Sequence, residues 1–252
     1  MGDEEELVFH LDRPIDLDHG VIIDGFPSVG LVSTIAANYI ISQCDLELVG
    51  SIHSPLMPIA AIIRDGVPTE PIRIYHGKGL LVFISEFRPP RELVIPLVNK
   101  LLAWEPVAHA SQFITLEGLP LPEGSDQATS PIYAVGTTAA MEQQIKDHKF
   151  KRLDDGMITG LSGVLLTEGH RRQYPVLCLM AGAHEAFPDA RGAARLVEAV
   201  DELLPQIDLP TGPLLKEADR VETAIRESLH RLHAAGGQTT GEAAESTEYI
   251  YR

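Results

Sequence analysis

Four glutamates stand where acidic residues often take part in chemistry, each just after an apolar run that predicts a β-strand. They are Glu86, Glu117, Glu168 and Glu185. Carboxylates at the ends of several strands can gather into an acid–base pair or a metal site. They can equally cap loops or form ion pairs between subunits, and we favour this second interpretation. His184, beside Glu185, is the best candidate for a catalytic side chain if the protein is an enzyme.

Two glycine-containing turns come close to known motifs, but each lacks a required residue. A nucleophile elbow around Ser162 would need glycine at position 164, where valine stands. Ser162 would also need a histidine partner, and nothing in the sequence marks one. The Gly25–Gly30 turn has a glycine at each end, as a phosphate-binding loop does, but Leu31-Val32 replaces the required Lys-Ser/Thr. We expect these glycines to serve a tight turn and close packing of a helix on the sheet.

A pair of histidines, His230 and His233, lies on one face of a predicted helix with the spacing of metal ligands. No third ligand follows at a suitable spacing, so we expect a solvated or interface pair. The sequence predicts no catalytic residue, no metal and no cofactor.

The C-terminus ends in an apolar and aromatic cluster, Tyr249-Ile250-Tyr251, followed by Arg252. It follows the run 234–248, which is rich in Gly, Thr, Ala and Glu and has no large apolar residue. Such a segment buries too little surface to become ordered by itself. The order of a hydrophobic residue, Tyr, any residue and a carboxylate suits capture in a pocket of a partner protein. We expect Ile250, Tyr251 and Arg252, with Tyr249, to bind a partner.

Composition and charge narrow the classes of partner. The formal net charge is −16, which disfavours nucleic acids and anionic membranes because both would repel the protein. No apolar run reaches the roughly 18–20 residues of a membrane span, and the acidic N-terminus is unlike a signal peptide. The two cysteines, Cys44 and Cys178, stand in apolar contexts, as expected for buried thiols in a reducing compartment. We expect a cytoplasmic protein that binds neither nucleic acid nor membrane.

The elements that must position these residues follow from hydrophobic periodicity. Strands are predicted at residues 7–12, 21–23, 47–51, 60–64, 72–76, 80–86, 113–118, 132–137, 164–168 and 175–181. Helices are predicted at 31–42, 91–104, 138–148, 190–204 and 214–233. Residues 65–86 are expected to form the antiparallel part of a mixed sheet, and Asp189 is expected to cap the helix that begins at 190.

These elements form one predicted unit. No internal repeat or linker interrupts residues 1–233, which we expect to be a single α/β domain, and residues 234–252 form a flexible tail. The predicted helix 214–233 has an apolar stripe that would pack either on the core or on a neighbouring subunit.

Five segments together resemble the proteasome-assembly-chaperone family. The similarity runs over roughly residues 7–230, and archaeal members are the most similar, because they carry the same kind of hydrophobic–Tyr–any-residue C-terminus. The segments are GFPSVGLVSTIAANYII, HSPLMPIAAI, IRIYHGKGLLVFISE, GMITGLSGVLL and EAFPDARGAARLVEAV.

The resemblance implies an α/β fold with a mixed, largely parallel sheet flanked by helices, a sandwich similar to nucleoside phosphorylases. It also implies homo-oligomers and a non-enzymatic role, either in building the 20S core from its α subunits or in docking on the α ring. Some relatives have been labelled ATP-grasp-like. The alternative is therefore a small-molecule or nucleotide-binding enzyme, ATP-grasp-like or nucleosidase-like, that uses the cleft near Gly25–Gly30 and Glu185.

Overall fold

The computed structural model describes residues 7–216, apart from residues 18, 65, 122–126, 128, 129 and 186. Its helices are α1 (Val32–Gln43), α2 (Arg91–Ala103), α3 (Glu105–Ala108), α4 (Ala139–Asp147), α5 (Gly160–Arg172) and α6 (Ala190–Leu203). Its first strands are β1 (Val8–Leu11), β2 (Val21–Gly25), β3 (Glu47–His53), β4 (Ile62–Arg64), β5 (Val67–Thr69), β6 (Ile72–Gly77) and β7 (Leu80–Ile84). The later strands are β8 (Gln112–Pro120), β9 (Tyr133–Gly136), β10 (Lys151–Arg152) and β11 (Val176–Ala183).

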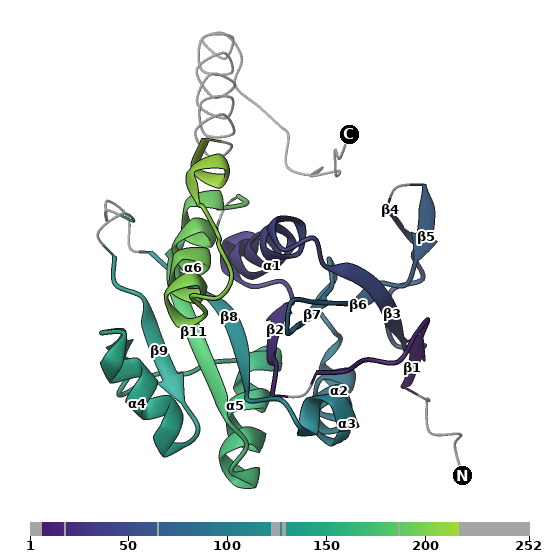
Figure 1. Cartoon of the computed structure of the whole chain (residues 1–252), viewed down its shortest axis with the longest axis horizontal. Helices are drawn as coiled ribbons and strands as arrows, with labels where there is room; N and C mark the ends of the chain where they lie inside the picture. The colour runs from purple at the N-terminus through teal and green to yellow at the C-terminus, as the bar shows by residue number, and fades with distance from the viewer. Residues whose placement is uncertain are drawn as a thin grey trace, which may run out of the picture.

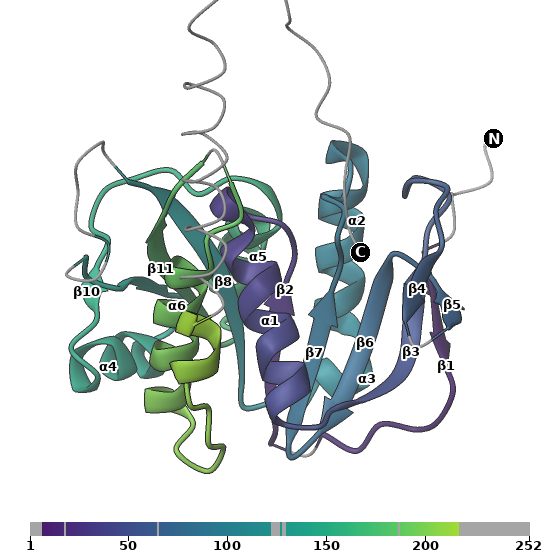
Figure 2. The same cartoon turned by 90° about the horizontal axis from the view of Figure 1, so that it is seen from above.

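In the described part of the chain, a nine-stranded sheet has the order β1-β3-β6-β7-β2-β8-β11-β9-β10. The central strands β7, β2, β8 and β11 pair in parallel, whereas β1, β3, β6 and β7 pair antiparallel. Helices α1 and α6 pack together on one face, and α2 and α5 on the other (Figures 1 and 2). A mixed α/β sheet flanked by helices is thus confirmed.

Alternation along the buried strands divides the core into two layers. In β2, Val21 and Ile23 belong to the layer under α1 and α6, and Ile22 belongs to the layer under α2 and α5. A strand buried on both faces needs this continuous apolar run, because successive side chains point to opposite faces. Asp24, on the α2–α5 face, departs from the run while remaining 1% exposed.

Two predictions were wrong. Residues 164–168, expected as a strand, lie inside α5, where Leu161 and Leu165 are buried on one helix face four residues apart. Residues 65–86 were expected to belong to the main sheet, but β5, a strand that was not predicted, pairs only with β4 in a separate two-stranded sheet. Pro68, inside β5, has no backbone N–H to donate, which suits a short strand outside a larger sheet.

The remaining predicted elements of the described chain agree closely with the structure, whereas α3 and β10 were not predicted. Helix α6 begins at Ala190, and the carboxylate of Asp189 accepts a hydrogen bond from the backbone N–H of Gly192 at 2.9 Å, which confirms the predicted cap. Both cysteines are free and buried. Nearly all of the predicted helix 214–233, together with His230, His233 and the tail residues 249–252, lies outside the described residues.

Candidate functional site

A group of polar side chains lies at the carboxyl ends of the central parallel strands. Strands β2 and β8 pair so that Asp24 stands opposite Thr115. Ile22 and Phe113, two residues earlier in each strand, belong to the core layer under α2 and α5. Because side chains alternate along a strand, Asp24, Thr115 and Glu117 all lie on that same face.

Helix α5 adds a serine to this group from above the sheet. Ser162 lies in the first turn of α5 and is 2% exposed. Its hydroxyl donates to Glu117 Oε1 at 2.7 Å and lies 2.7 Å from Thr115 Oγ1. The polar group thus joins two strands and one helix, which are far apart in the sequence.

Asp24 has the most perturbed environment of the group. Its pKa is raised from 3.8 to about 8. Burial is the largest cause and the charge of Glu117 adds to it, while contacts with Thr115 and the backbone of Phe26 act in the opposite direction. Loss of water disfavours the ionised form of a carboxyl group. At neutral pH Asp24 therefore carries a proton.

One proton on Asp24 completes a chain of hydrogen bonds. Each hydroxyl has a single hydrogen, and the Ser162 hydrogen goes to Glu117. Thr115 then gives its single hydrogen to Ser162, so a hydrogen bond between Thr115 and Asp24 needs a donor on the carboxyl group of Asp24. The protonated carboxyl supplies that donor, so the bonds run from Asp24 through Thr115 and Ser162 to Glu117.

Glu117 is the acceptor at the end of this chain. Burial raises its pKa, while hydrogen bonds from Ser162 and the backbone N–H of Gly118, and the charge of Arg88, lower it. Two carboxyl groups with different partners can hold different protonation states in one site. Such a pair can bind donors or pass a proton.

A cavity of about 180 Å³ opens on this group. It is lined by Asp24, Phe26, Pro27, Ser28, Val29, Arg88, Pro89, Val94, Glu117, Thr159, Gly160, Leu161 and Ser162. A second cavity of about 360 Å³ shares Ser28, Val29 and Arg88 with it, so the two form one cleft, which we call the strand-end cleft. The helices that follow β2 and β7 cover opposite faces of the sheet, and open α/β sheets bind ligands at such a point.

The Gly25–Gly30 turn serves close packing, as predicted. A Cβ atom on Gly25 would lie 2.2 Å from Cβ of Ala37 in α1. Gly30 has φ +61°, and a Cβ atom there would lie 2.7 Å from the backbone oxygen of His184. The turn also helps to form the strand-end cleft, because Ser28 and Val29 line both of its parts.

Glu185 lies at the wider part of the strand-end cleft, and His184 precedes it in the chain. The Asp189 carboxylate is 2.7 Å from Nδ1 of His184 and also accepts from the His184 backbone N–H. The His184 ring stacks on Phe187 at 5.1 Å, and Glu185 lines the cleft wall. Within the described chain, the hydrogen-bond partners of Ser162 are Thr115 and Glu117, so no serine–histidine pair forms.

Glu86 and Glu168 are engaged elsewhere. Glu86 accepts two hydrogen bonds from Arg73, at 2.8 and 2.6 Å, and one from Arg64 at 3.0 Å. Glu168 lies within α5, where it pairs with the neighbouring Arg171 and Arg172. The four glutamates therefore do not gather. No group of three or more His, Cys, Asp or Glu side chains is placed to hold a metal ion in the described part of the chain.

The sequence profile of one family covers most of the chain, matching residues 22–229. The chain belongs to the PAC2 family. This confirms the resemblance seen in the sequence motifs. The PAC2 protein is 23% identical over 214 residues to an uncharacterized protein of Methanocaldococcus jannaschii, covering 84% of this chain and 87% of that one.

Solved structures place the fold in the same family. Pyrococcus furiosus PbaA, described as an archaeal homolog of proteasome-assembly chaperone, matches with TM-score 0.82 and 29% identity, covering 90% of this chain and 94% of PbaA. Pyrococcus furiosus PbaB, described as an archaeal proteasome activator, matches in fold with TM-score 0.78 and 20% identity, covering 89% and 99%.

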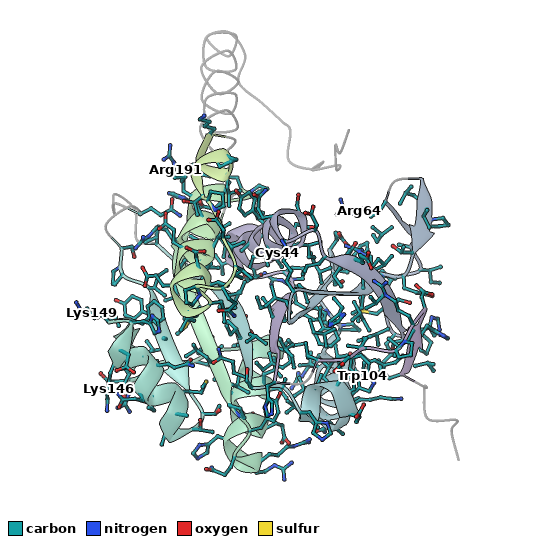
Figure 3. The ribbon with its side chains drawn as sticks, viewed as in Figure 1. Cys44, Arg64, Trp104, Lys146, Lys149 and Arg191 are labelled. Atoms are coloured by element: carbon teal, nitrogen blue, oxygen red, sulfur yellow. The ribbon has the colours of Figure 1, made fainter. Side chains whose placement is uncertain are left out.

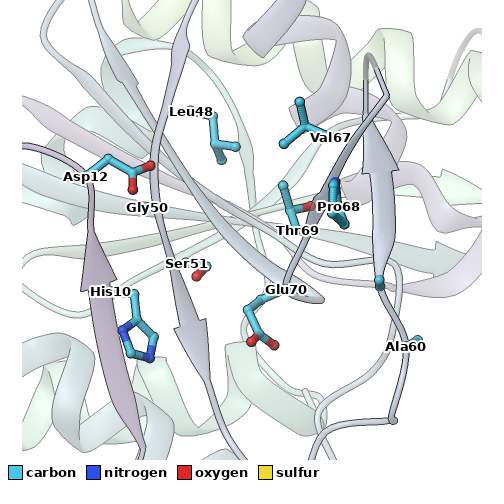
Figure 4. A pocket seen from close by; sticks show the side chains of 11 residues that line it. His10, Asp12, Leu48, Gly50, Ser51, Ala60, Val67, Pro68, Thr69 and Glu70 are labelled. Atoms are coloured by element: carbon cyan, nitrogen blue, oxygen red, sulfur yellow. The ribbon is translucent and has the colours of Figure 1, made fainter.

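A separate hollow of about 480 Å³ lies near the β1–β3 edge of the PAC2 sheet (Figure 4). His10 and Asp12 line it from the β1 side, Gly50 and Ser51 from β3, and residues 67–70 from the side of β5 and the residue after it. We call β4 and β5 together the β4–β5 arm. None of the residues that line this hollow has a buried polar side-chain atom without a partner, unlike Asp24 in the strand-end cleft.

Sequence reasoning found Glu117, Glu185 and His184 but missed Asp24 and Thr115. The available signal was an aspartate that ends the apolar run Val21-Ile22-Ile23. No membrane-crossing helix exists among the described residues.

Proposed function

We propose that this PAC2 protein acts in the cytoplasm as a non-enzymatic assembly chaperone or docking factor for the α subunits of the 20S proteasome. The observation that carries the proposal is its likeness to PbaA, an archaeal homolog of proteasome-assembly chaperone, at 29% identity over 90% of this chain. The name of PbaB, an archaeal proteasome activator with the same fold, supports the same class of partner.

The contact is assigned to the C-terminal residues Ile250, Tyr251 and Arg252. Tyr251 places its ring in a pocket between α subunits and satisfies its hydroxyl at the pocket mouth. Ile250 adds an apolar contact, and the terminal carboxylate pairs with a basic side chain of the partner. Arg252 contributes mainly through that carboxylate, so the contact requires that Arg252 end the chain. Tyr249 adds contact at the rim.

The segment 234–248 serves as a tether. A flexible chain of about 15 residues has an end-to-end distance of roughly 20–23 Å. One tail binds weakly, but several tails on one body bind strongly because each bound tail raises the local concentration of the next. The proposal therefore includes self-association of residues 1–233. The apolar side chains of Ile59, Ile63 and Val67, which are 106%, 61% and 56% exposed, offer a surface for a second copy.

Pull-down of purified proteasome α subunits by the full chain tests the proposal. Removal of residues 250–252 is expected to abolish binding while circular dichroism and molecular mass per assembly stay unchanged. Tyr251→Ala is expected to cause most of that loss, and Tyr249→Ala a smaller loss.

An added alanine after Arg252 is the matched control for the carboxylate. It keeps every side chain and moves only the charged end, so it is expected to weaken binding strongly, whereas Arg252→Ala is expected to weaken it little. Unchanged capture of α subunits by the shortened chain would show that the tail does not carry the contact.

A further inference from the structure

The strand-end cleft contains a buried polar atom that lacks a partner. Asp24 is 1% exposed, and its Oδ2 atom makes no hydrogen bond, although the side chain lines the cavity of about 180 Å³. Buried polar atoms in folded proteins nearly always have a partner, because leaving one unpaired is costly. A molecule bound in that cavity would lie beside the same side chain.

The chain of hydrogen bonds defines what that partner must be. The proton on Asp24 is directed to Thr115, so the other oxygen of the carboxyl group is left as an acceptor. Glu117, in the same cavity, accepts from Ser162 through Oε1 and has a second oxygen that can accept another bond. The free oxygens of Asp24 and Glu117 are both acceptors, so a ligand that bonds to both must carry a group with several N–H donors.

The charges around the cleft indicate what charge the part of the ligand beside Arg88 carries. Arg88 lines both parts of the cleft and lies close enough to Glu117 to act on its charge. Glu185 lines the wider part, and the whole protein has a net charge of −16. One guanidinium among carboxylates fits a single negative charge, while a polyphosphate would be repelled.

Size and wall polarity narrow the class further. A volume of about 180 Å³ equals roughly six water molecules at about 30 Å³ each. This inner cavity beside Asp24, without the wider part of the cleft, holds a small molecule rather than a nucleotide. Apolar side chains form much of the wall: Phe26, Pro27, Val29, Pro89, Val94 and Leu161.

We propose that the strand-end cleft binds a small zwitterion, an α-amino acid with an apolar side chain. Its ammonium group donates to Asp24 Oδ2 and to Glu117. Its carboxylate pairs with Arg88, and its side chain packs on the apolar wall. This site is separate from the proteasome contact assigned to the tail, and either can exist without the other.

Titration calorimetry of the full chain with L-leucine, L-methionine and L-phenylalanine tests the proposal. Saturable binding of at least one of the three at millimolar concentration is the expected result. For the amino acid that binds, its amide lacks the carboxylate and its N-acetyl derivative lacks the ammonium group, so each is expected to bind at least tenfold more weakly. Adenosine monophosphate and inorganic phosphate are expected not to bind.

Three variants tie binding to the cleft. Arg88→Ala and Asp24→Val are each expected to lower affinity for the amino acid at least tenfold. Arg171→Ala, on the exposed end of α5, is the matched control and is expected to leave affinity unchanged. Asp24→Val also removes the unpaired atom, so its melting temperature is expected to equal or exceed that of the parent, which separates loss of the site from loss of the fold.

Several results would overturn the proposal. These are no binding of any of the three amino acids, equal binding of the amide and N-acetyl forms, unchanged affinity in Asp24→Val, or preferential binding of adenosine monophosphate. Removal of residues 250–252 is expected to leave amino-acid binding intact, so failure of this proposal and failure of the tail contact give different results.

Discussion

The strand-end cleft and the β4–β5 arm break the usual rule of apolar inside and polar outside in opposite ways. The cleft buries carboxyl and hydroxyl groups between the central strands and α5. The arm holds Ile63 and Val67 in solvent, and Ile59 just before it is fully exposed. Buried polar groups and exposed apolar side chains lower stability. They are therefore found mainly at functional sites, where binding or catalysis requires them. The cleft is suited to a small polar ligand, and the arm to an apolar surface of another chain.

The two regions also differ in what holds them in place. The cleft lies at the carboxyl ends of the central strands, and strand register fixes its polar side chains. The arm forms its own small sheet, but Arg64, labelled in Figure 3, shares Glu86 with the fully buried Arg73 of β6. The guanidinium of Arg73 thus has its charge balanced by a carboxylate that also contacts the arm. Four predictions test this comparison.

The largest expected effect concerns the proton on Asp24. The unfolded side chain releases its proton near pH 3.8, whereas the folded one holds it to about pH 8. The folded state therefore binds more protons between these values, and the contribution of Asp24 to stability falls as pH rises from about 4 to about 8. The side chain in Asp24→Asn cannot ionise, so this pH dependence of stability is expected to disappear. At pH 8 the free energy of unfolding of the variant is expected to exceed that of the parent by at most about 5 kcal/mol.

Urea unfolding of the parent and Asp24→Asn from pH 4 to pH 8 measures this effect. The two curves are expected to converge at the acid end and separate at pH 8, with the variant more stable. Asp208→Asn, at an exposed carboxylate, is the control. Parallel pH profiles of the parent and Asp24→Asn would show that Asp24 is not held protonated.

The next effect concerns the junction between arm and sheet. Glu86→Ala leaves the buried guanidinium of Arg73 without its carboxylate, and removal of one partner from a buried ion pair typically costs about 3–5 kcal/mol. The arm also loses its contact through Arg64, so amide hydrogen exchange in residues 62–69 is expected to speed up.

Glu168→Ala removes a glutamate that also pairs with two arginines, but at the surface of α5. It is expected to change stability far less than Glu86→Ala. Chemical denaturation measures both variants. An equal loss of unfolding free energy in Glu86→Ala and Glu168→Ala would show that the buried pair does not stabilise the fold more than the exposed one.

A smaller effect is expected at the turn beside the cleft. Gly30→Ala places a Cβ atom 2.7 Å from a backbone oxygen at φ +61°, and we expect a loss of about 2–3 kcal/mol from strain and overpacking. Gly160→Ala has a similar φ of +70° but nothing within 4 Å of the new atom. Its loss, measured by thermal unfolding, is expected to be about half as large, and a loss equal to that of Gly30→Ala would mean that crowding contributes nothing.

The smallest effect on stability is expected on the arm. Ile59→Ser, Ile63→Thr and Val67→Thr together replace exposed side chains, and each is expected to change stability by less than about 0.5 kcal/mol. The same triple variant is expected to reduce self-association, measured by light scattering. Ile95→Gln, at an exposed position of α2, is the control. An unchanged molecular mass in the triple variant would rule out the arm as the contact between copies.

Much of the architecture was determined by the sequence alone. Unbroken apolar runs such as Val21-Ile22-Ile23 indicated central strands, and the 3.6-residue period indicated α2, because burial of a face requires that spacing. The motifs also indicated the family, which the profile match confirms. The tail assignment at residues 249–252 remains a prediction from sequence.

The sequence indicated a cleft near Gly25–Gly30 and Glu185, but only the tertiary structure decided its polar group and the separate arm. Asp24, Thr115 and Ser162 are separated by long stretches of chain, and strand register and the placement of α5 bring them together. The sequence around residue 164 was ambiguous because a short apolar run fits a buried strand and a buried helix face equally well. The local sequence pattern indicates which residues are buried. Which residues they contact depends on how distant parts of the chain pack together.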